Sequence, residues 1–169
     1  GKLRLLDFHR QNDNYPIHLT LMAPLMEKGV PAPSCVGVLL LKIDPMRLIY
    51  PLIQSWPMPS GSAETLLVRR DGEDVLFLNE LRHKKDSALK LRAPISQQTL
   101  PAAMAVAGKE GVVQGLDYRG VSVLAVLRRI PGTPWCMGSK VDSSEVFAPL
   151  KTQGVMVAVV VGGMLLAAG

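Results

Sequence analysis

The stretch at residues 64–81, ETLLVRRDGEDVLFLNEL, constrains the fold more than any other part of this sequence. Two apolar runs, at 66–68 and 75–78, flank the dipeptide Asp71-Gly72. Because Asp and Gly tolerate the positive φ that a chain reversal needs, this pattern predicts a β-hairpin that turns over residues 69–72. An isolated hairpin is only marginally stable in water, so other segments must cover its apolar face.

The chain beyond residue 100 supplies both further strands and a helix. Residues 101–109 predict a short helix, because Pro stands at its start and Gly near its end. Apolar runs at 112–116 and 121–127 flank the turn DYRG, and residues 135–141 predict a last strand after the turn PGTP. Asp142, with Glu145 three positions later, has the spacing of a capping box and predicts another helix.

This order of elements predicts an α+β fold in which a PAS-like, five-stranded antiparallel sheet carries flanking helices. The chain has 169 residues, which is enough for one full domain and a fragment of another.

The N-terminal part predicts two strands without a domain of their own. Residues 1–16 are mixed and polar, and residues 18–25 alternate as a strand does. Residues 36–43, VGVLLLKI, are apolar enough for a strand that is buried on both faces. We expect these two strands to form an antiparallel pair.

A helix and a linker join these strands to the hairpin. Asp44 and Pro45 are suited to the N-cap and the first helical position, and Pro51 would kink or interrupt the helix. The helix would bury a stripe of apolar residues: Met46, Leu48, Ile49, Leu52, Ile53 and Trp56. Residues 57–62, rich in Pro, Gly and Ser, then predict a linker.

Residues 155–168, VMVAVVVGGMLLAA, contain no charged or strongly polar residue. As a helix, these fourteen positions would span about 21 Å of a hydrocarbon core about 30 Å thick. We expect the start of a transmembrane helix here, because the apolar run is unbroken and the sequence stops inside it, as an excerpt from a longer polypeptide would. A buried core helix is the alternative.

The remaining composition excludes some functions. A net charge of +5 is explained more simply by a solvated basic surface than by an acidic partner. The whole chain has three Phe, three Tyr and two Trp, and few of them stand near the basic cluster, so we predict no nucleic-acid partner. Cys35 and Cys136 lack neighbours at metal-ligand spacing, which predicts no metal site, and they are either free thiols or a disulfide.

A basic segment follows the hairpin, with five Lys or Arg residues in positions 82–92. One interpretation is a cationic lip, in which Arg82 or Arg92 binds a carboxylate and His83 adds a pH-dependent donor. The other is a solvated loop whose long side chains cover the sheet edge. Both interpretations stay open from the residues alone.

The predicted binding site lies between the central sheet and the loop at 79–92, with the DYRG turn at its rim. Small-molecule sites combine an apolar wall with a few convergent polar groups, and these segments can bring such groups together. The predicted ligand-binding residues are Asn79, Arg82, His83, Arg92, Tyr118 and Arg119.

Three stretches resemble a known family: YPLIQSWPMPSGSAETLLVRRDGEDVLFLNELRH, GVVQGLDYRGVSVLAVLRRIPGTPWCMGSKVD, and the capped helix before the apolar run. They are similar to extracytoplasmic Cache sensor domains of bacterial transmembrane receptors, in particular to the membrane-proximal half of a double Cache module. The resemblance implies four segments: final strands of a membrane-distal subdomain (1–45), a connecting helix and linker (46–61), a proximal PAS-like domain (62–150) and the start of a transmembrane helix (151–169).

The resemblance implies a sensor input that binds a small molecule, possibly anionic, and needs no cofactor. It also implies a homodimer in the full receptor, an inner-membrane location with a periplasmic sensor, and a cytoplasmic histidine kinase, diguanylate cyclase or chemoreceptor module as output. Two features depart from the family: Cys136 replaces a larger apolar residue, and most of the distal half is absent.

The alternative is a membrane-anchored extracytoplasmic domain with a structural or hydrolytic role. The sequence shows no nucleophile with a base, no paired carboxylates and no phosphate-binding loop, so we predict that this segment is not an enzyme and has no catalytic residues.

Overall fold

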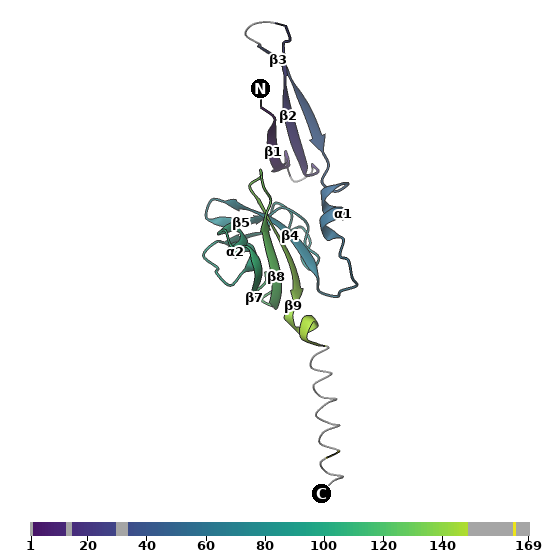
Figure 1. The fold of residues 1–169 in the computed structure, drawn as a ribbon, viewed down its shortest axis with the longest axis vertical. Coiled ribbons are helices and arrows are strands. Elements are labelled where there is room, and N and C mark those ends of the chain that lie inside the picture. Colours follow the sequence, from purple (N-terminus) through teal and green to yellow (C-terminus); the bar gives the residue numbers. More distant parts are fainter. Residues whose placement is uncertain (1, 13–14, 30–33, 149–163, 165–169) are drawn as a thin grey trace.

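The computed structural model describes residues 2–12, 15–29, 34–148 and 164, which form two antiparallel sheets (Figure 1). The small sheet has the order β1-β2-β3, and the main sheet has the order β6-β5-β4-β9-β8-β7. Figure 1 shows the small sheet at one end of the main sheet, with helix α1 beside the junction.

The main sheet confirms the predicted hairpins and the α+β class. Its elements are β4 (Glu64–Asp71), β5 (Asp74–Phe77), β6 (Arg92–Pro94), α2 (Pro101–Val106), β7 (Gly111–Leu116), β8 (Ser122–Arg129) and β9 (Trp135–Asp142). In the first hairpin the strand continues to Asp71, which pairs with Asp74, so the turn covers residues 71–74, two positions later than predicted. Gly72 makes this reversal with a φ of 64°.

The predicted count of five strands is wrong, because the main sheet has six. The additional strand is β6, which pairs with β5 at the edge of the sheet. Three residues are too few to show a strand-like alternation, and Pro94 argues against a central strand while an edge strand tolerates it.

One face of the main sheet packs against α2 and forms the larger core. Its buried residues come from α2, from five strands and from the adjoining positions Leu81 and Leu100, with Phe77, Leu100 and Leu127 among the largest. Gly115 allows this packing, since a Cβ at this position would stand 2.3 Å from the carbonyl oxygen of Thr99. The segment that leads into α2 can therefore lie directly on β7.

The small sheet consists of β1 (Arg4–His9), β2 (His18–Met26) and β3 (Cys35–Ile43). The predicted antiparallel pairing of β2 with β3 is confirmed, whereas β1 lies in a segment interpreted as irregular. The prediction that β3 is buried on both faces is wrong: Val36 and residues 38–41 are more than half exposed, and Ile43 at the end of the strand packs against the second core.

Helix α1 (Ile49–Gln54) is shorter than predicted. Asp44 accepts a hydrogen bond from the backbone N–H of Met46. This contact stabilises a turn that precedes α1, so Asp44 does not cap the helix itself. Pro51 lies in the first turn of α1, where its missing N–H costs nothing, so it causes no interruption. Half of the expected apolar stripe is solvent-exposed, namely Met46, Leu48 and Leu52. Ile49, Ile53 and Trp56 are partly buried, and Tyr50, which is not in the predicted stripe, is the buried residue of α1.

A second core joins the two sheets. Phe8, Leu19 and Tyr50 come from the N-terminal part and pack against residues of the other face of the main sheet: Leu67, Leu76, Leu78 and Trp135. Phe8 and Trp135 contact each other with ring centroids 4.9 Å apart. The small sheet is thus fixed to the main domain by apolar burial.

Asp7 adds polar contacts at the rim of this second core. Its Oδ1 accepts a hydrogen bond of 2.6 Å from Nε1 of Trp135, and its Oδ2 lies 3.0 Å from Nη1 of Arg69. All three side chains are partly or largely buried, so these contacts fix the position of β1 relative to β4 and β9.

The chain leaves the main sheet through a helix at residues 143–148, at the end of the sheet away from the small sheet (Figure 1). The predicted capping box is not formed, because the carboxylate of Asp142 pairs with Arg119 and that of Glu145 with Ser60 and Ser62. The apolar run at 155–168 lies outside the described residues, apart from Met164. Within the described residues, no helix has the length and apolarity needed to span a bilayer.

Both cysteines are free thiols in the structure. Cys35 is exposed on the small sheet, whereas Cys136 is buried in the main core, where burial raises the pKa of its thiol.

Truncation of a leucine at the junction tests the second core. Leu19 is 2% exposed and Leu41, on the same sheet, is 54% exposed. We expect Leu19→Ala to lower the free energy of unfolding by about 2 to 5 kcal/mol and Leu41→Ala to change it by less than about 0.5 kcal/mol. Urea denaturation followed by circular dichroism measures both, and equal effects would contradict the packing described for this junction.

Candidate ligand-binding site

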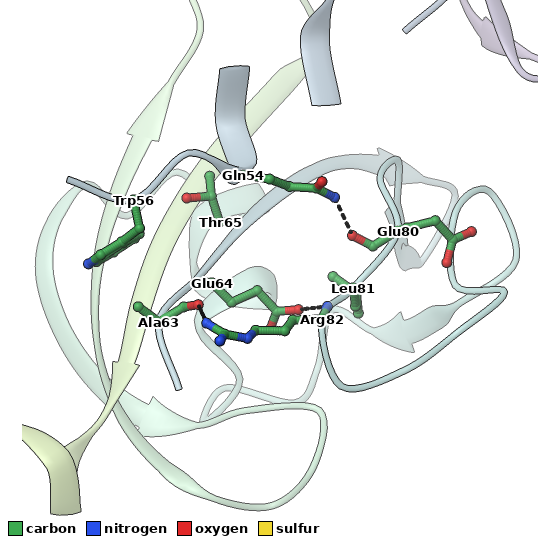
Figure 2. A pocket seen from close by; sticks show the side chains of 8 residues that line it. All are labelled: Gln54, Trp56, Ala63, Glu64, Thr65, Glu80, Leu81 and Arg82. Atoms are coloured by element: carbon green, nitrogen blue, oxygen red, sulfur yellow. Dashed lines mark hydrogen bonds between the residues drawn. The ribbon is translucent and has the colours of Figure 1, made fainter. Parts of the chain in front are cut away.

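A cavity of about 390 Å³ lies where the end of α1 approaches the start of β4 and the segment after β5 (Figure 2). The cavity overlaps the predicted region between the sheet and the loop at 79–92 through residues 80–82 of that loop. The cavity is lined by Gln54, Trp56, Ala63, Glu64, Thr65, Glu80, Leu81 and Arg82. Its volume lies within the range of small-molecule sites.

Arg82 supplies a guanidinium group at this cavity. Its Nη1 donates a hydrogen bond of 3.0 Å to the carbonyl oxygen of Ala63, and the side chain is solvent-exposed. Among the described residues no carboxylate pairs with this guanidinium, so its remaining N–H donors can take up an anionic group.

Two further lining residues are Trp56, which supplies an aromatic ring, and Gln54, which supplies an amide. Trp56 is partly buried and lines the cavity beside Ala63, where its indole adds apolar surface (Figure 2). The Nε2 of Gln54 lies 3.4 Å from the carbonyl oxygen of Glu80. The carboxylate of Glu80 points away from the cavity in Figure 2 and accepts hydrogen bonds from Ser87 and Ala88.

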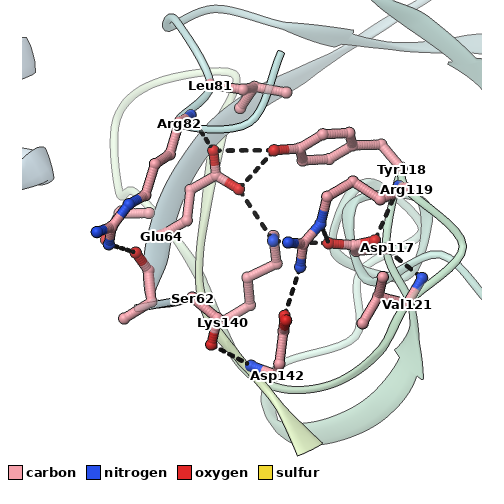
Figure 3. A network of polar contacts seen from close by, with 12 residues as sticks. Ser62, Glu64, Leu81, Arg82, Asp117, Tyr118, Arg119, Val121, Lys140 and Asp142 are labelled. Atoms are coloured by element: carbon pink, nitrogen blue, oxygen red, sulfur yellow. Dashed lines mark hydrogen bonds and ion pairs between the residues drawn. The ribbon is translucent and has the colours of Figure 1, made fainter. Parts of the chain in front are cut away.

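Behind the cavity, Glu64 joins a buried network of charges (Figure 3). Glu64 and Lys140 are register partners on β4 and β9, and their charged atoms lie 2.9 Å apart. Lys140 Nζ also lies 2.7 Å from Oδ2 of Asp117, and the Lys140 side chain is fully buried. Two carboxylates therefore compensate one buried ammonium group, which is what makes its burial tolerable.

Arg119 extends the network toward the end of β9. Its Nε donates to Asp117 Oδ2 at 2.7 Å, and its Nη2 pairs with Asp142. Burial disfavours the charge of Asp117, but hydrogen bonds from Lys140 and Arg119 outweigh it and lower the pKa of this carboxyl below its usual value. Burial similarly opposes the charge of Arg119, while Asp117 and Asp142 raise its pKa.

Tyr118 connects the DYRG turn to Glu64. Its hydroxyl donates to the Glu64 carboxylate, with oxygen–oxygen distances of 2.9 and 3.1 Å. Burial and the negative charge of Glu64 raise the pKa of this phenol well above its usual value, so the hydroxyl keeps its proton and remains a donor. The Lys140 Nζ lies 5.1 Å from the centroid of the same ring, a cation–π contact.

The structure brings three of the six predicted residues to the cavity or the network. Arg82 lines the cavity and donates its backbone N–H to Glu64. Tyr118 reaches Glu64 from the other side, and Arg119 binds Asp117 and Asp142 farther from the cavity.

The other three predicted residues lie apart from the cavity lining. Asn79 is fully buried, where its amide bonds the backbone of Leu67 and Thr65 and holds β4 to the chain after β5. His83 is exposed on the loop, and Arg92 pairs with Asp71 at the β6 edge. Arg92 also lowers the pKa of the Asp71 carboxyl through this hydrogen bond.

Sequence reasoning missed Glu64, Lys140 and Trp56. A signal for the first two exists: along β4 and β9, Glu64 and Lys140 occupy the same alternating positions as Leu66 and Cys136, which face the core. A charged residue at a core-facing position needs a buried partner. Within the described residues, no three His, Cys, Asp or Glu side chains are grouped as a metal site would require.

The fold is similar to three solved sensor domains. The ligand-binding domain of Mlp24 with asparagine gives a TM-score of 0.56 at 18% identity, over 89% of this chain and 55% of that chain. The periplasmic sensory domain of the Campylobacter jejuni chemoreceptor Tlp1 gives 0.56 at 15%, over 88% and 52%. The ligand-binding domain of the Pseudomonas fluorescens chemoreceptor CtaA in complex with L-leucine gives 0.52 at 15%, over 86% and 55%.

These similarities confirm the predicted fold, that of chemoreceptor sensor domains of the PAS/Cache-like type. The chain spans about half the length of each of the structures that it matches. No protein-family model matches the sequence, and no curated protein matches it.

Removal of the buried ammonium group tests the network. We expect Lys140→Met to lower the free energy of unfolding by about 3 to 5 kcal/mol at pH 7, because Glu64 and Asp117 lose their buried partner. Lys109→Met is the matched control at an exposed position and should change it by less than about 0.5 kcal/mol. Chemical denaturation measures both, and a small effect of Lys140→Met would contradict the pairing.

The lowered pKa of Asp117 predicts a pH dependence of stability. Because the folded pKa lies below the unfolded value of about 3.9, the stabilisation by Asp117 is complete above that value and is lost as the pH falls toward the folded pKa. We therefore expect the difference in unfolding free energy between the wild type and Asp117→Asn to be constant above about pH 5 and to narrow in more acidic buffer. A difference that widens below pH 4 would show the opposite sign of the shift.

Proposed function

We propose that this chain is the extracytoplasmic ligand-sensing part of a bacterial membrane receptor. The observation that carries the proposal is a cavity of small-molecule size, with the Arg82 guanidinium at its edge, in a fold similar to chemoreceptor sensor domains. The output is a cytoplasmic signalling module, namely a histidine kinase, a diguanylate cyclase or a chemoreceptor domain.

The ligand that fits the cavity is a small carboxylate, and an amino acid in particular. Arg82 offers paired N–H donors that match a carboxylate, while Trp56 offers an apolar face for a side chain and Gln54 an amide. Two of the similar domains are described with asparagine and with L-leucine, which supports this ligand class. The ring of Trp56 also suits an ammonium group through a cation–π contact.

The segments implied by the family resemblance belong to the same proposal. Residues 1–45 would be the last strands of a membrane-distal subdomain, residues 46–61 its connection, and residues 62–150 the membrane-proximal domain. The exposed apolar side chains of β3 support the first assignment, since a larger distal subdomain would cover them. The apolar run at 155–168 would anchor the chain in the inner membrane, and the full receptor would be a homodimer.

The alternative of a membrane-anchored hydrolytic or structural domain gains no support from the cavity. None of the described residues that line it is a Ser, Cys or His. A nucleophile and its base would need to lie within hydrogen-bond reach of each other. A sensor that binds without converting its ligand fits this lining.

Two arginines of the predicted site provide a matched pair for the test. Arg82 lines the cavity, whereas Arg92 is held by Asp71 at the sheet edge. We expect L-asparagine or L-leucine to bind the wild type, and Arg82→Ala to weaken binding about tenfold or more through loss of a charge-assisted contact. Arg92→Ala should leave the affinity unchanged, as measured by isothermal titration calorimetry.

Two outcomes would contradict the proposal for this cavity. The first is that neither amino acid, nor any member of a panel of small carboxylates, binds the wild-type chain. The second is that a carboxylate binds but both arginine variants retain its full affinity, which would place the site elsewhere.

A further inference from the structure

A short strap, residues 56–63, runs between the ligand cavity and the C-terminal helix at residues 143–148. Trp56 lines the ligand cavity and also a second cavity of about 290 Å³, which Ser60, Val141 and Glu145 help to line. The strap therefore lines the ligand cavity at one end and contacts the helix at 143–148 at the other.

Glu145 fastens the helix to the strap. The Ser60 hydroxyl donates to Glu145 Oε1 at 2.6 Å, and the Ser62 backbone N–H donates to Oε2 at 3.0 Å. The Ser62 hydroxyl also donates to Oε2 and accepts the backbone N–H of Asp142 at 3.0 Å. Hydrogen bonds from Ser60 and Ser62 lower the pKa of the Glu145 carboxyl, so it stays ionised as an acceptor.

The last two residues of the strap and the first residue of β4 contact three different parts of the molecule. Ser62 holds the helix through Glu145, the Ala63 carbonyl accepts from Arg82, and Glu64 binds Lys140 and Tyr118. All three residues are less than 8% exposed. The Ala63 carbonyl shares a peptide plane with the N–H of Glu64, and the preceding plane joins Ala63 to the carbonyl of Ser62, so two rigid planar units connect the three residues.

A second polar path joins the same two ends. It leads from Glu64 through Lys140 to Asp117, and then through Arg119 to Asp142, the residue before the helix. Figure 3 shows these side chains as one continuous set between Arg82 and Asp142. This second path consists of contacts between buried or partly buried groups, which solvent screens weakly.

From this geometry we propose that Ser62 to Glu64 couple the Arg82 side of the cavity to the C-terminal helix, with Glu145 as the fastening point. A carboxylate that binds through both Nη1 and Nη2 of Arg82 takes Nη1 from the Ala63 carbonyl. Loss of the hydrogen bond between Arg82 and Ala63 allows the strap to shift. That shift changes the hydrogen bonds that Ser60 and Ser62 donate to Glu145. The ligand-driven part of this coupling rests on the proposed function, whereas the mechanical link does not.

The link is tested first without any ligand, by hydrogen–deuterium exchange of the full chain. We expect Arg82→Ala to change the exchange rate of the amides at 143–148 about fivefold or more, although Arg82 touches no residue of that helix in the described structure. Arg82→Lys, which can still donate to Ala63, should restore the wild-type rate. Glu73→Gln removes a carboxylate at the distant β4–β5 turn and should have no effect.

The reciprocal measurement follows from thermodynamic linkage. Glu145→Gln should change the exchange of the Arg82 backbone amide, which donates to Glu64, by a similar factor. Core amides such as that of Val75 serve as the control for global unfolding in every variant. If the helix amides exchange at the wild-type rate in Arg82→Ala while the core stays protected, the coupling is wrong.

A binding experiment with ligand distinguishes failure of the coupling from failure of the proposed function. If L-asparagine or L-leucine binds the wild type, Glu145→Gln should alter its dissociation constant about fivefold or more, and Glu73→Gln should not. Binding that is insensitive to Glu145→Gln would overturn the coupling and leave the sensor function standing. If neither amino acid binds, the proposed ligand class fails, and the exchange measurements alone decide the coupling.

Discussion

The ammonium group of Lys140 is fully buried between the carboxylates of Glu64 and Asp117, and the arrangement of the main sheet around the site depends on this contact. A lone buried charge would cost several kcal/mol, so the three groups must stay together whenever the domain is folded. They fix β4 and β9 against the DYRG turn, and they orient Tyr118 and the backbone of Arg82 toward Glu64. The rigid back of the cavity is thus a consequence of one buried ion cluster.

Strand β9 connects this ion cluster to the small sheet at one end and to the C-terminal helix at the other. At its start, Trp135 packs on Phe8 and binds Asp7 of the small sheet, and at its end Asp142 leads into the helix at 143–148. Lys140 lies near that end, next to the strap that forms a wall of the cavity. In the proposed coupling, one strand and one short segment of chain connect the cavity to the C-terminal helix.

Several features of the fold could be predicted because they are local. Gly72 and Gly120 mark the turns of both hairpins, and Pro101 with Gly108 marks α2. A ligand site beside the loop after β5 stays a prediction, and of its six predicted residues Arg82 lines the cavity there. Arg92 and His83 could not be separated from Arg82 by sequence, since all three lie in one basic segment and their partners decide their roles. The short strand β6 was missed for lack of any periodic pattern.

The sequence by itself determined the positions of the hairpins, the turns and α2, because each depends on residues within a few positions of one another. Only the tertiary structure decided which charges are buried together, since Glu64, Asp117 and Lys140 come from separate elements that the sheet register aligns. It also decided that Asp142 and Glu145 bind Arg119 and the serines of the strap instead of capping their own helix. Local spacing allowed the cap, and stronger partners from distant parts of the chain replaced it.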